Sequence, residues 1–404
     1  MKKWLITLVA IFGIGFISSA ILAGRVYYQD LQHYTDYDKQ VLQVEALKNI
    51  YIRSSIPIEI HPTSDIPYVE FNQSFTDLMG LAPEYELNIE TKGENTYIEL
   101  NKTKEMHLSL GVKESRAQLS VYLPQTTINR LNITNNQYFN YKHNKQVINL
   151  EGIHVNELIA NMNETAFILD GKYESIRINV PQGQMNLKSN APVQLMTQGN
   201  LEQYLMGEFD KINIKENSKD IMIDSNTTNS IEINSYYSNI SLKGNYNNIK
   251  LKGDHNAVDI ESGSICRLYT EGYNNFINGN GAFNTMNLSE KSSQIEIQTT
   301  VIPDKLDFSR ETANSTLNLT LPSNIPGLTV RYLNNDREEE NQIEDDEEYE
   351  ADDLDLVSDF ILEKVKGEAG ECIFTYGKGN CQILINGDQE NRLEIIDGVY
   401  SSRA

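Results

Sequence analysis

Three aromatic side chains recur at an interval that could place them on one edge of a fold. Tyr237, His255 and Tyr273 follow one another at equal intervals in the sequence. In a repeat whose coil has that length they would stack in a single column, and an exposed aromatic column can hold a sugar or a partner chain. The alternative is that the rings only shield the corner on which they stand. The first interpretation makes these three residues the candidate ligand or partner surface.

A small group of carboxylates is the nearest thing to a catalytic cluster. Asp254, Asp259 and Glu261 lie close together in the sequence. Enzymes that cleave polysaccharides need carboxylates, alone or with basic groups, that converge on one face. No constellation of Arg or Lys accompanies these three residues. We therefore predict a protein that is not an enzyme, and a polysaccharide-acting β-helix enzyme is the alternative.

Other residue types that carry chemistry are scattered. The six histidines form no HExxH motif and no pair at the spacing of metal ligands. The sequence has no GxSxG motif, and Gly377-Lys378-Gly379 lacks the other residues of a phosphate-binding loop. We expect no catalytic residue, no cofactor and no metal site.

The three cysteines allow one cross-link. Cys372 and Cys381 lie nine residues apart, which would place them on consecutive strands. A disulfide between them is one interpretation, within the limits of disulfide geometry, and two small buried residues is the other. Cys266 has no evident partner and is expected to be buried.

The elements that must position these residues are short strands in a long repeat. Apolar residues occur in pairs separated by one residue, and from residue 212 the pairs begin every nine or ten residues. Alternation within a pair predicts a strand with one buried face, and the constant step predicts a repeat architecture. The pairs are Ile212/Ile214, Ile221/Ile223, Ile231/Ile233, Ile240/Leu242, Ile249/Leu251, Val258/Ile260, Met286/Leu288 and Ile295/Ile297. Further pairs at similar steps extend the pattern back to Leu131.

Two architectures have strands at such intervals, a β-sandwich and a parallel β-solenoid. The very short strands, the uniform steps and the Asn-rich turns, such as Tyr246-Asn247-Asn248, favour the solenoid. The predicted fold class is all-β, a parallel β-solenoid with strand units of nine or ten residues over 47–333, preceded by one transmembrane helix.

The N-terminal segment has the composition of a membrane anchor. Lys2 and Lys3 precede an uncharged run from Trp4 to Gly24, which is long enough to span a bilayer as a helix. A cleaved signal peptide is the alternative, because Ser18-Ser19-Ala20 resembles a cleavage site. We predict an anchor over 1–25 and a juxtamembrane spacer over 26–46. The protein would then be a single-pass protein of the cell membrane with an extracytoplasmic C-terminal domain.

The C-terminal part interrupts the repeat. Asp336–Asp355 contains 13 acidic residues and one Arg, so a disordered acidic insertion is predicted over 334–356, with calcium binding as the alternative. Apolar spacing then predicts a short helix over 357–367. Closing β units are expected over 368–398 and a polar tail over 399–404. The net charge of −23 argues against nucleic acid as a partner.

The order of these segments resembles a known family. An anchor followed by LKNIYIRSSIPIEIHPTSDIPYVEF and LSVYLPQTTINRLNITNN, and later STLNLTLPSNIPGLTVRY and CIFTYGKGNCQILINGD, is similar to the bacterial putative-adhesin family of β-strand-repeat proteins. The resemblance implies a β-strand-repeat domain of the cell envelope and transfers no catalytic residue. It points to an adhesin, an envelope scaffold or a sensor, with an envelope glycan or a membrane protein as partner. A regulatory accessory of an envelope-stress system is a further alternative.

Overall fold

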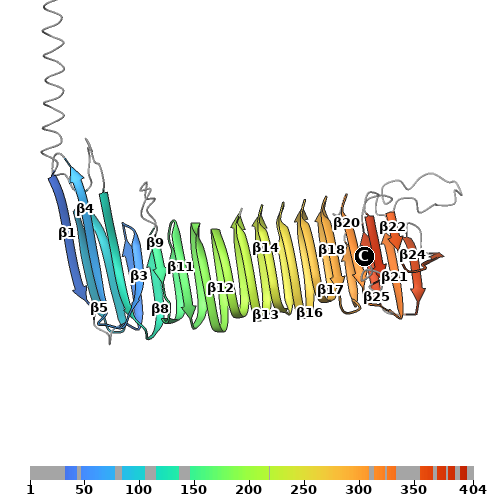
Figure 1. The fold of residues 1–404 in the computed structure, drawn as a ribbon, viewed down its shortest axis with the longest axis horizontal. Coiled ribbons are helices and arrows are strands. Elements are labelled where there is room, and N and C mark those ends of the chain that lie inside the picture. Colours follow the sequence, from blue (N-terminus) through green and yellow to red (C-terminus); the bar gives the residue numbers. More distant parts are fainter. Residues whose placement is uncertain are drawn as a thin grey trace, which may run out of the picture.

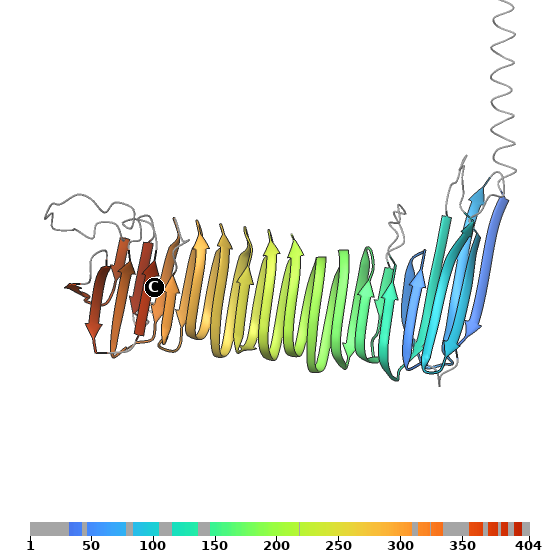
Figure 2. The same cartoon turned by 180° about the vertical axis from the view of Figure 1, so that it is seen from behind.

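The computed structural model describes residues 32–42, 47–77, 84–104, 115–135, 146–217, 219–308, 314–323, 325–333, 355–366, 371–378, 381–386 and 392–397. Within these ranges the chain is all-β, with 26 strands hydrogen-bonded in one sheet. Figures 1 and 2 show the strands side by side in a long rod, with the first strands at one end and the last at the other.

The strands of the N-terminal part are β1 (Gln32–Val41), β2 (Asn49–Ser54), β3 (Ile58–Thr63), β4 (Tyr68–Asp77), β5 (Glu84–Lys92), β6 (Asn95–Lys104), β7 (Ser115–Pro124), β8 (Thr127–Thr134) and β9 (Gln146–Asn149). The central part contains β10 (His154–Asn161), β11 (Thr165–Gly171), β12 (Tyr173–Asn217), β13 (Asp220–Tyr236), β14 (Asn239–Tyr246), β15 (Asn248–Lys252), β16 (Ala257–Tyr273), β17 (Phe276–Lys291) and β18 (Gln294–Thr299). The C-terminal part contains β19 (Lys305–Phe308), β20 (Thr316–Leu321), β21 (Gly327–Leu333), β22 (Asp355–Ser358), β23 (Glu363–Lys366), β24 (Glu371–Gly377), β25 (Cys381–Asn386) and β26 (Arg392–Asp397).

In the centre of the rod the chain alternates between two parallel ladders. Ladder A contains residues 203–207, 220–225, 239–244, 257–262, 276–281 and 294–299. Ladder B contains residues 211–217, 230–236, 248–252, 267–273, 285–291 and 305–308. Neighbours within a ladder lie about 4.8 Å apart, as in any sheet.

The core lies between the two ladders. All eight predicted apolar pairs from Ile212/Ile214 to Ile295/Ile297 are buried, and the residues between their members point outward. This alternation confirms the predicted strand face, because side chains along a strand point to opposite sides. One buried aromatic, Tyr246, adds polar anchoring, since its hydroxyl donates to the carbonyls of Lys243 and Ile223 at 2.6 and 3.1 Å.

The ends of the rod depart from this parallel pattern. At the N-terminal end, β1 pairs antiparallel with β4, β4 with β7, and β5 with β6. At the C-terminal end, β24 runs antiparallel to both β21 and β23. Antiparallel pairs need only a tight turn, whereas parallel pairs need a crossover. The β5–β6 turn accordingly has Gly93 at a positive φ of 60°.

The predicted fold class, a parallel β-solenoid preceded by a transmembrane helix, is therefore wrong as stated. The described chain carries no helix, and its sheet mixes parallel ladders with antiparallel ends. Residues predicted as a helix over 357–367 contribute instead to β22 and β23. Their apolar residues fit the short strands equally well, and pairing with β26 and β24 decides between the two.

The predicted localisation is also corrected. No helix in the described ranges is long and apolar enough to cross a membrane, against the prediction of a single-pass membrane protein. The predicted anchor, residues 1–25, lies outside the described residues, and most of the predicted spacer is strand β1. The acidic insertion and the tail also lie outside the described residues, apart from the start of β22. As predicted, strands resume afterwards: β25 continues from β19, and β26 from β20.

Candidate ligand-binding groove

The chain turns from ladder B to ladder A along one edge of the rod, which we call the aromatic edge. Each turn there contains one residue in the left-handed region: Tyr237, His255, Asn274 and Ser292, with φ between 51° and 59°. Backbone hydrogen bonds link each turn to the next, as from Tyr237 N–H to the carbonyl of Asp254. Left-handed backbone is unusual for Tyr and His, so the neighbouring turns must hold these residues in place.

The predicted aromatic column is present, with one change of geometry. The rings of Tyr237 and His255 are stacked, with centroids 4.6 Å apart and planes 22° apart. Tyr273 meets His255 edge-on, at 5.5 Å and 67°. Tyr237 is 64% exposed and Tyr273 43%, so both rings are open to solvent.

The change arises from the register of the strands. Between β15 and β16 the offset is one residue longer than the interval of the column, because Lys252 lies opposite Glu271. The same longer offset holds beyond the turn, where β16 pairs with β17. Asn274 therefore takes the place that corresponds to His255, and Tyr273 lies opposite Asp254. Tyr273 thus belongs to the last position of the strand, one residue before the turn.

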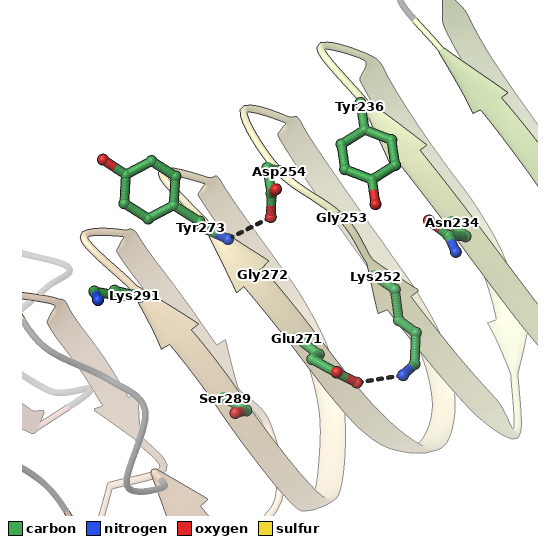
Figure 3. Close-up of a pocket in the computed structure, with 10 residues that line it drawn as sticks. All are labelled: Asn234, Tyr236, Lys252, Gly253, Asp254, Glu271, Gly272, Tyr273, Ser289 and Lys291. Carbon is green, nitrogen blue, oxygen red and sulfur yellow. Dashed lines mark hydrogen bonds and ion pairs between the residues drawn. The ribbon is translucent and has the colours of Figure 1, made fainter.

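Beside the column lies a groove of about 450 Å³ (Figure 3). Its lining residues come from the ends of four successive ladder B strands, and they are Asn234, Tyr236, Lys252, Gly253, Asp254, Glu271, Gly272, Tyr273, Ser289 and Lys291. Tyr236 and Tyr273 place two further exposed rings at its border. The groove is therefore a polar hollow bordered by aromatic rings.

Two glycines leave the space that the groove occupies. A Cβ on Gly253 would lie 1.9 Å from the carbonyl oxygen of Ser235, and one on Gly272 would lie 2.0 Å from that of Gly253. Gly253 also has a φ of 114°, which L-residues rarely adopt. Both positions follow Lys252 and Glu271 directly, so the bare backbone separates the charged row from the aromatic turn.

The charged row of the groove contains an ion pair. Lys252 Nζ binds Glu271 Oε2 across neighbouring strands, and the Tyr269 hydroxyl donates to the same oxygen at 2.9 Å. The hydrogen bond from Lys252 is the main reason that the pKa of Glu271 is lowered, and the same bond raises the pKa of Lys252. Both groups therefore stay charged at neutral pH.

The remaining polar groups leave donors and acceptors for a ligand. Asp254 Oδ1 accepts the backbone N–H of Tyr273 at 3.0 Å, which uses only part of its capacity as an acceptor. Lys291 is exposed and makes no ion pair with another described residue. Asn234 and Ser289 add an amide and a hydroxyl. Together these groups can bind several hydroxyls of one ligand.

Buried polar residues hold the aromatic edge from inside. Asn256 Oδ1 accepts the N–H of Ser238 at 3.0 Å, and Asn275 Oδ1 accepts the N–H of Asn256 at 2.8 Å. Asn275 also donates to Glu290 at 2.8 Å. Burial raises the pKa of Glu290 despite these bonds. The side chains replace the ladder bonds that the turns cannot make, which keeps the turn geometry fixed.

Glu216 holds a similar place at an earlier turn. It lies opposite Ser235 in ladder B, and its carboxyl group accepts bonds from Leu201 N–H at 2.7 Å and Gln203 Nε2 at 2.8 Å. Burial raises its pKa to about 8. Its side chain points into the rod and not into the groove, since the residue is only 2% exposed.

The structure separates the three predicted carboxylates. Asp254 lines the groove, whereas Asp259 and Glu261 point outward from β16 on ladder A. Asp259 accepts from Asn278 Nδ2 at 3.0 Å, and Glu261 pairs with Lys243 at 3.2 Å. No group of three or more His, Cys, Asp or Glu in the described ranges could hold a metal ion.

The predicted disulfide is not formed. Cys381 is a free, buried thiol, and burial raises its pKa to about 11. Cys372 lies opposite Tyr332 on one side of β21, while Cys381 lies opposite Leu328 on the other side, so a whole strand separates them. Cys266 is free and buried, as predicted.

Several groove residues escaped the sequence reasoning. Tyr236, Lys252, Glu271 and Lys291 are ordinary outward residues in the strand pattern, and no motif marks them. A usable signal was the pair Gly253 and Gly272, each directly after a charged strand residue and before the turn. A glycine at a repeated position indicates close approach of backbones.

The comparisons with known proteins give only distant similarity. No family model matches the chain, and no curated protein is similar to it. A solved structure of a putative cell adhesion protein from Clostridium sporogenes ATCC 15579 is similar at 9% identity, with 90% of this chain and 100% of that chain covered and a TM-score of 0.19. A putative adhesin from Bacteroides fragilis NCTC 9343 is similar at 8% identity, with coverage of 90% and 97% and a TM-score of 0.19. Likeness at this level carries no argument about function.

Proposed function

We propose that this chain is a non-enzymatic binding protein of the adhesin type, and that its groove binds a glycan. The observation that carries the proposal is the exposed aromatic column beside a polar hollow on the same edge. Aromatic rings bind the apolar faces of sugars, and carboxylate, amide and ammonium groups bind their hydroxyls. Tyr236 and Tyr273 provide the rings, and Asp254, Asn234 and Lys291 provide the polar groups.

The arrangement of the groove along the rod suits an extended ligand. Its lining residues repeat from strand to strand at about 4.8 Å, the ordinary spacing of a sheet. This repeat is comparable to the length of one pyranose unit in an extended chain. A polysaccharide lying along the rod would therefore meet a similar set of groups at each strand.

The state of the carboxylates favours binding over catalysis. A glycosidase needs a carboxyl group that keeps its proton near neutral pH, as well as a second carboxylate. Glu271 has a lowered pKa because Lys252 and Tyr269 bind it. The carboxyl groups with raised pKa, Glu216 and Glu290, are buried behind the turns.

Binding of the full chain to immobilised neutral, amino-sugar and acidic polysaccharides tests the proposal. The double variant Tyr237→Asn with Tyr273→Ser should bind the best of these ligands at least tenfold more weakly. Asn is chosen at 237 because Asn274 already adopts the same left-handed conformation. Binding to a member of this panel that the double variant abolishes would support the groove as the site.

A matched control uses another tyrosine pair. Tyr51 and Tyr97 stack at 5.0 Å on the N-terminal part of ladder B, remote from the groove. The variant Tyr51→Ser with Tyr97→Ser should leave binding unchanged. Equal loss in both variants, or no binding to any polysaccharide, would contradict the proposed site. Release of reducing ends from a bound polysaccharide would show instead that the protein is an enzyme.

A further inference from the structure

The two outer faces of the rod differ in charge. Between residues 201 and 299 the outward side chains of ladder A include six carboxylates and one lysine, a net charge of −5, and we call this the acidic face. These residues are Glu202, Asp220, Asp224, Lys243, Asp259, Glu261 and Glu296. Such a face is expected from a chain with a net charge of −23.

The opposite face has the other sign. Between residues 211 and 289 the outward side chains of ladder B include five basic and two acidic residues, a net charge of +3, and we call this the basic face. These residues are Lys211, Lys215, Glu232, Lys250, Lys252, Arg267 and Glu271. Because the core lies between the ladders, the two faces point away from each other.

Many of these charges have no partner within the rod. On the basic face, Lys250 pairs with Glu232 and Lys252 with Glu271, whereas Lys211, Lys215 and Arg267 make no ion pair with another described residue. On the acidic face only Glu261 is paired, with Lys243. The unpaired carboxylates of the acidic face are those of Glu202, Asp220, Asp224, Asp259 and Glu296.

The acidic face also exposes apolar surface that a partner could bury. Tyr204 is 38% exposed, Met206 52%, Met222 48% and Phe276 44%. Met222 and Phe276 border a hollow of about 440 Å³ that Asp220 and Asp259 also line. A partner for this face therefore needs both cations and some apolar contact.

We propose that the basic face of one copy of this chain binds the acidic face of a second copy, so that the rods associate side by side. Both faces occupy the same stretch of the rod, so a sideways displacement of one copy brings them together. The contact joins two different surfaces, and each copy keeps one free face of each sign. Association of this type does not close and continues into an open array.

The net charge of the chain opposes this association only weakly at moderate salt. Screening limits the repulsion between whole molecules to about 10 Å at 0.1 M salt, whereas the facing charges are in contact. The inference rests on the charged faces and not on the groove. Its test therefore uses residues that do not line the groove.

Sedimentation velocity of the full chain tests the proposal. At about 50 mM salt the mean sedimentation coefficient should rise with protein concentration, and at about 500 mM salt it should return to that of a monomer, because salt screens the facing charges. A reversed basic face (Lys211→Glu, Lys215→Glu, Arg267→Glu) should remain monomeric at low salt. A reversed acidic face (Asp220→Lys, Asp224→Lys, Asp259→Lys) should do the same.

Mixing the two reversed proteins provides the decisive measurement. One then carries two negative faces and the other two positive faces, so an equimolar mixture should associate although each alone does not. The matched control, Lys102→Glu with Lys364→Glu and Lys378→Glu, changes the charge equally but off both faces and should associate like the natural chain.

A wild-type chain that is monomeric under all conditions, or a mixture that stays monomeric while both variants keep their circular dichroism spectra, would overturn the proposal. A basic-face variant that still associates would also overturn it. Dextran sulfate serves as a probe for the rival occupant: if it binds the basic face of a chain that remains monomeric, that face recognises a polyanion and not a second copy.

Discussion

The two edges of the rod make the same reversal of direction in different ways. On the aromatic edge, where ladder B passes to ladder A, the strand register is the same before and after each turn. Asn217 pairs with Tyr236 just before one such turn, and Asp220 pairs with Asn239 at the same offset just after it. On the opposite edge, which we call the glycine edge, the register changes, as it does within β12. The glycine edge therefore absorbs the variation in repeat length.

This difference explains where the groove can form. Constant register keeps the turns of the aromatic edge aligned, so their side chains repeat along the rod and can bind one extended ligand. Bulges displace the turns of the glycine edge, as between Ser225 and Thr228 and between Ser262 and Ile265, so successive side chains do not line up. A repeating binding surface requires the edge without insertions.

The largest expected effect comes from a matched pair of glycines, one on each edge. Gly253 on the aromatic edge has a φ of 114°, and Gly244 on the glycine edge has a φ of 136°. An added Cβ would lie 1.9 Å from a carbonyl oxygen in both cases. Gly253→Ala and Gly244→Ala should each lower the free energy of unfolding by about 3 kcal/mol. Urea denaturation measures this loss.

The same pair separates stability from binding. Below the unfolding transition, Gly253→Ala should weaken glycan binding, because its methyl group enters the groove, whereas Gly244→Ala should bind like the natural chain. If both variants lost affinity in proportion to stability, the groove would have no specific part in binding.

The second expected effect concerns a buried carboxyl group behind the aromatic edge. Burial raises the pKa of Glu216 from 4.5 to about 8, so the folded chain holds a proton that the unfolded chain releases at lower pH. The stability from this group is complete below pH 4.5 and declines as the pH rises towards 8. Between pH 5 and 9 the decline should be about 2 kcal/mol, and Glu216→Gln should remove it.

Urea denaturation at several pH values measures this slope, with Glu174→Gln as the control at an exposed position. The glycine edge has a neutral buried pair at the comparable depth, Ser225 with Thr228, so we assign the slope to the aromatic edge. An unchanged slope in Glu216→Gln would place its origin elsewhere, with Glu290 as the next candidate because burial raises its pKa as well.

The sequence was most informative where the physical rule is local. Alternating apolar residues identify a buried strand face without reference to partners, and for this reason pairs such as Ile231/Ile233 were predicted correctly. Pairing partners depend on register, which single-residue insertions change. Tyr273 follows His255 at the regular interval of the column, but the strands there are offset by one residue more, so Tyr273 lies beside Asp254.

The same limit explains the other errors. Leu356, Val357, Phe360, Ile361 and Val365 fit a helical spacing, but strands β24 and β26 supply hydrogen-bond partners that the sequence alone does not reveal. Cys372 and Cys381 are nine residues apart, the usual step between strands, yet β21 runs between them. Most groove residues carry no motif because their proximity comes only from the stacking of strands.

The smallest expected effect on stability comes from the ring at the outer end of the aromatic column. Tyr237→Asn removes the stacking on His255, which contributes about 0.5–1 kcal/mol. It also relieves a left-handed conformation that Asn adopts more readily than Tyr. The two changes oppose each other, so the free energy of unfolding should stay within about 0.5 kcal/mol of the natural value. Urea denaturation at pH 7 checks this, and a loss above about 2 kcal/mol would mean that the ring serves mainly to hold the turn. A neutral result, combined with weaker glycan binding, would mean that the aromatic edge keeps Tyr237 in an unfavourable conformation for the sake of its ligand.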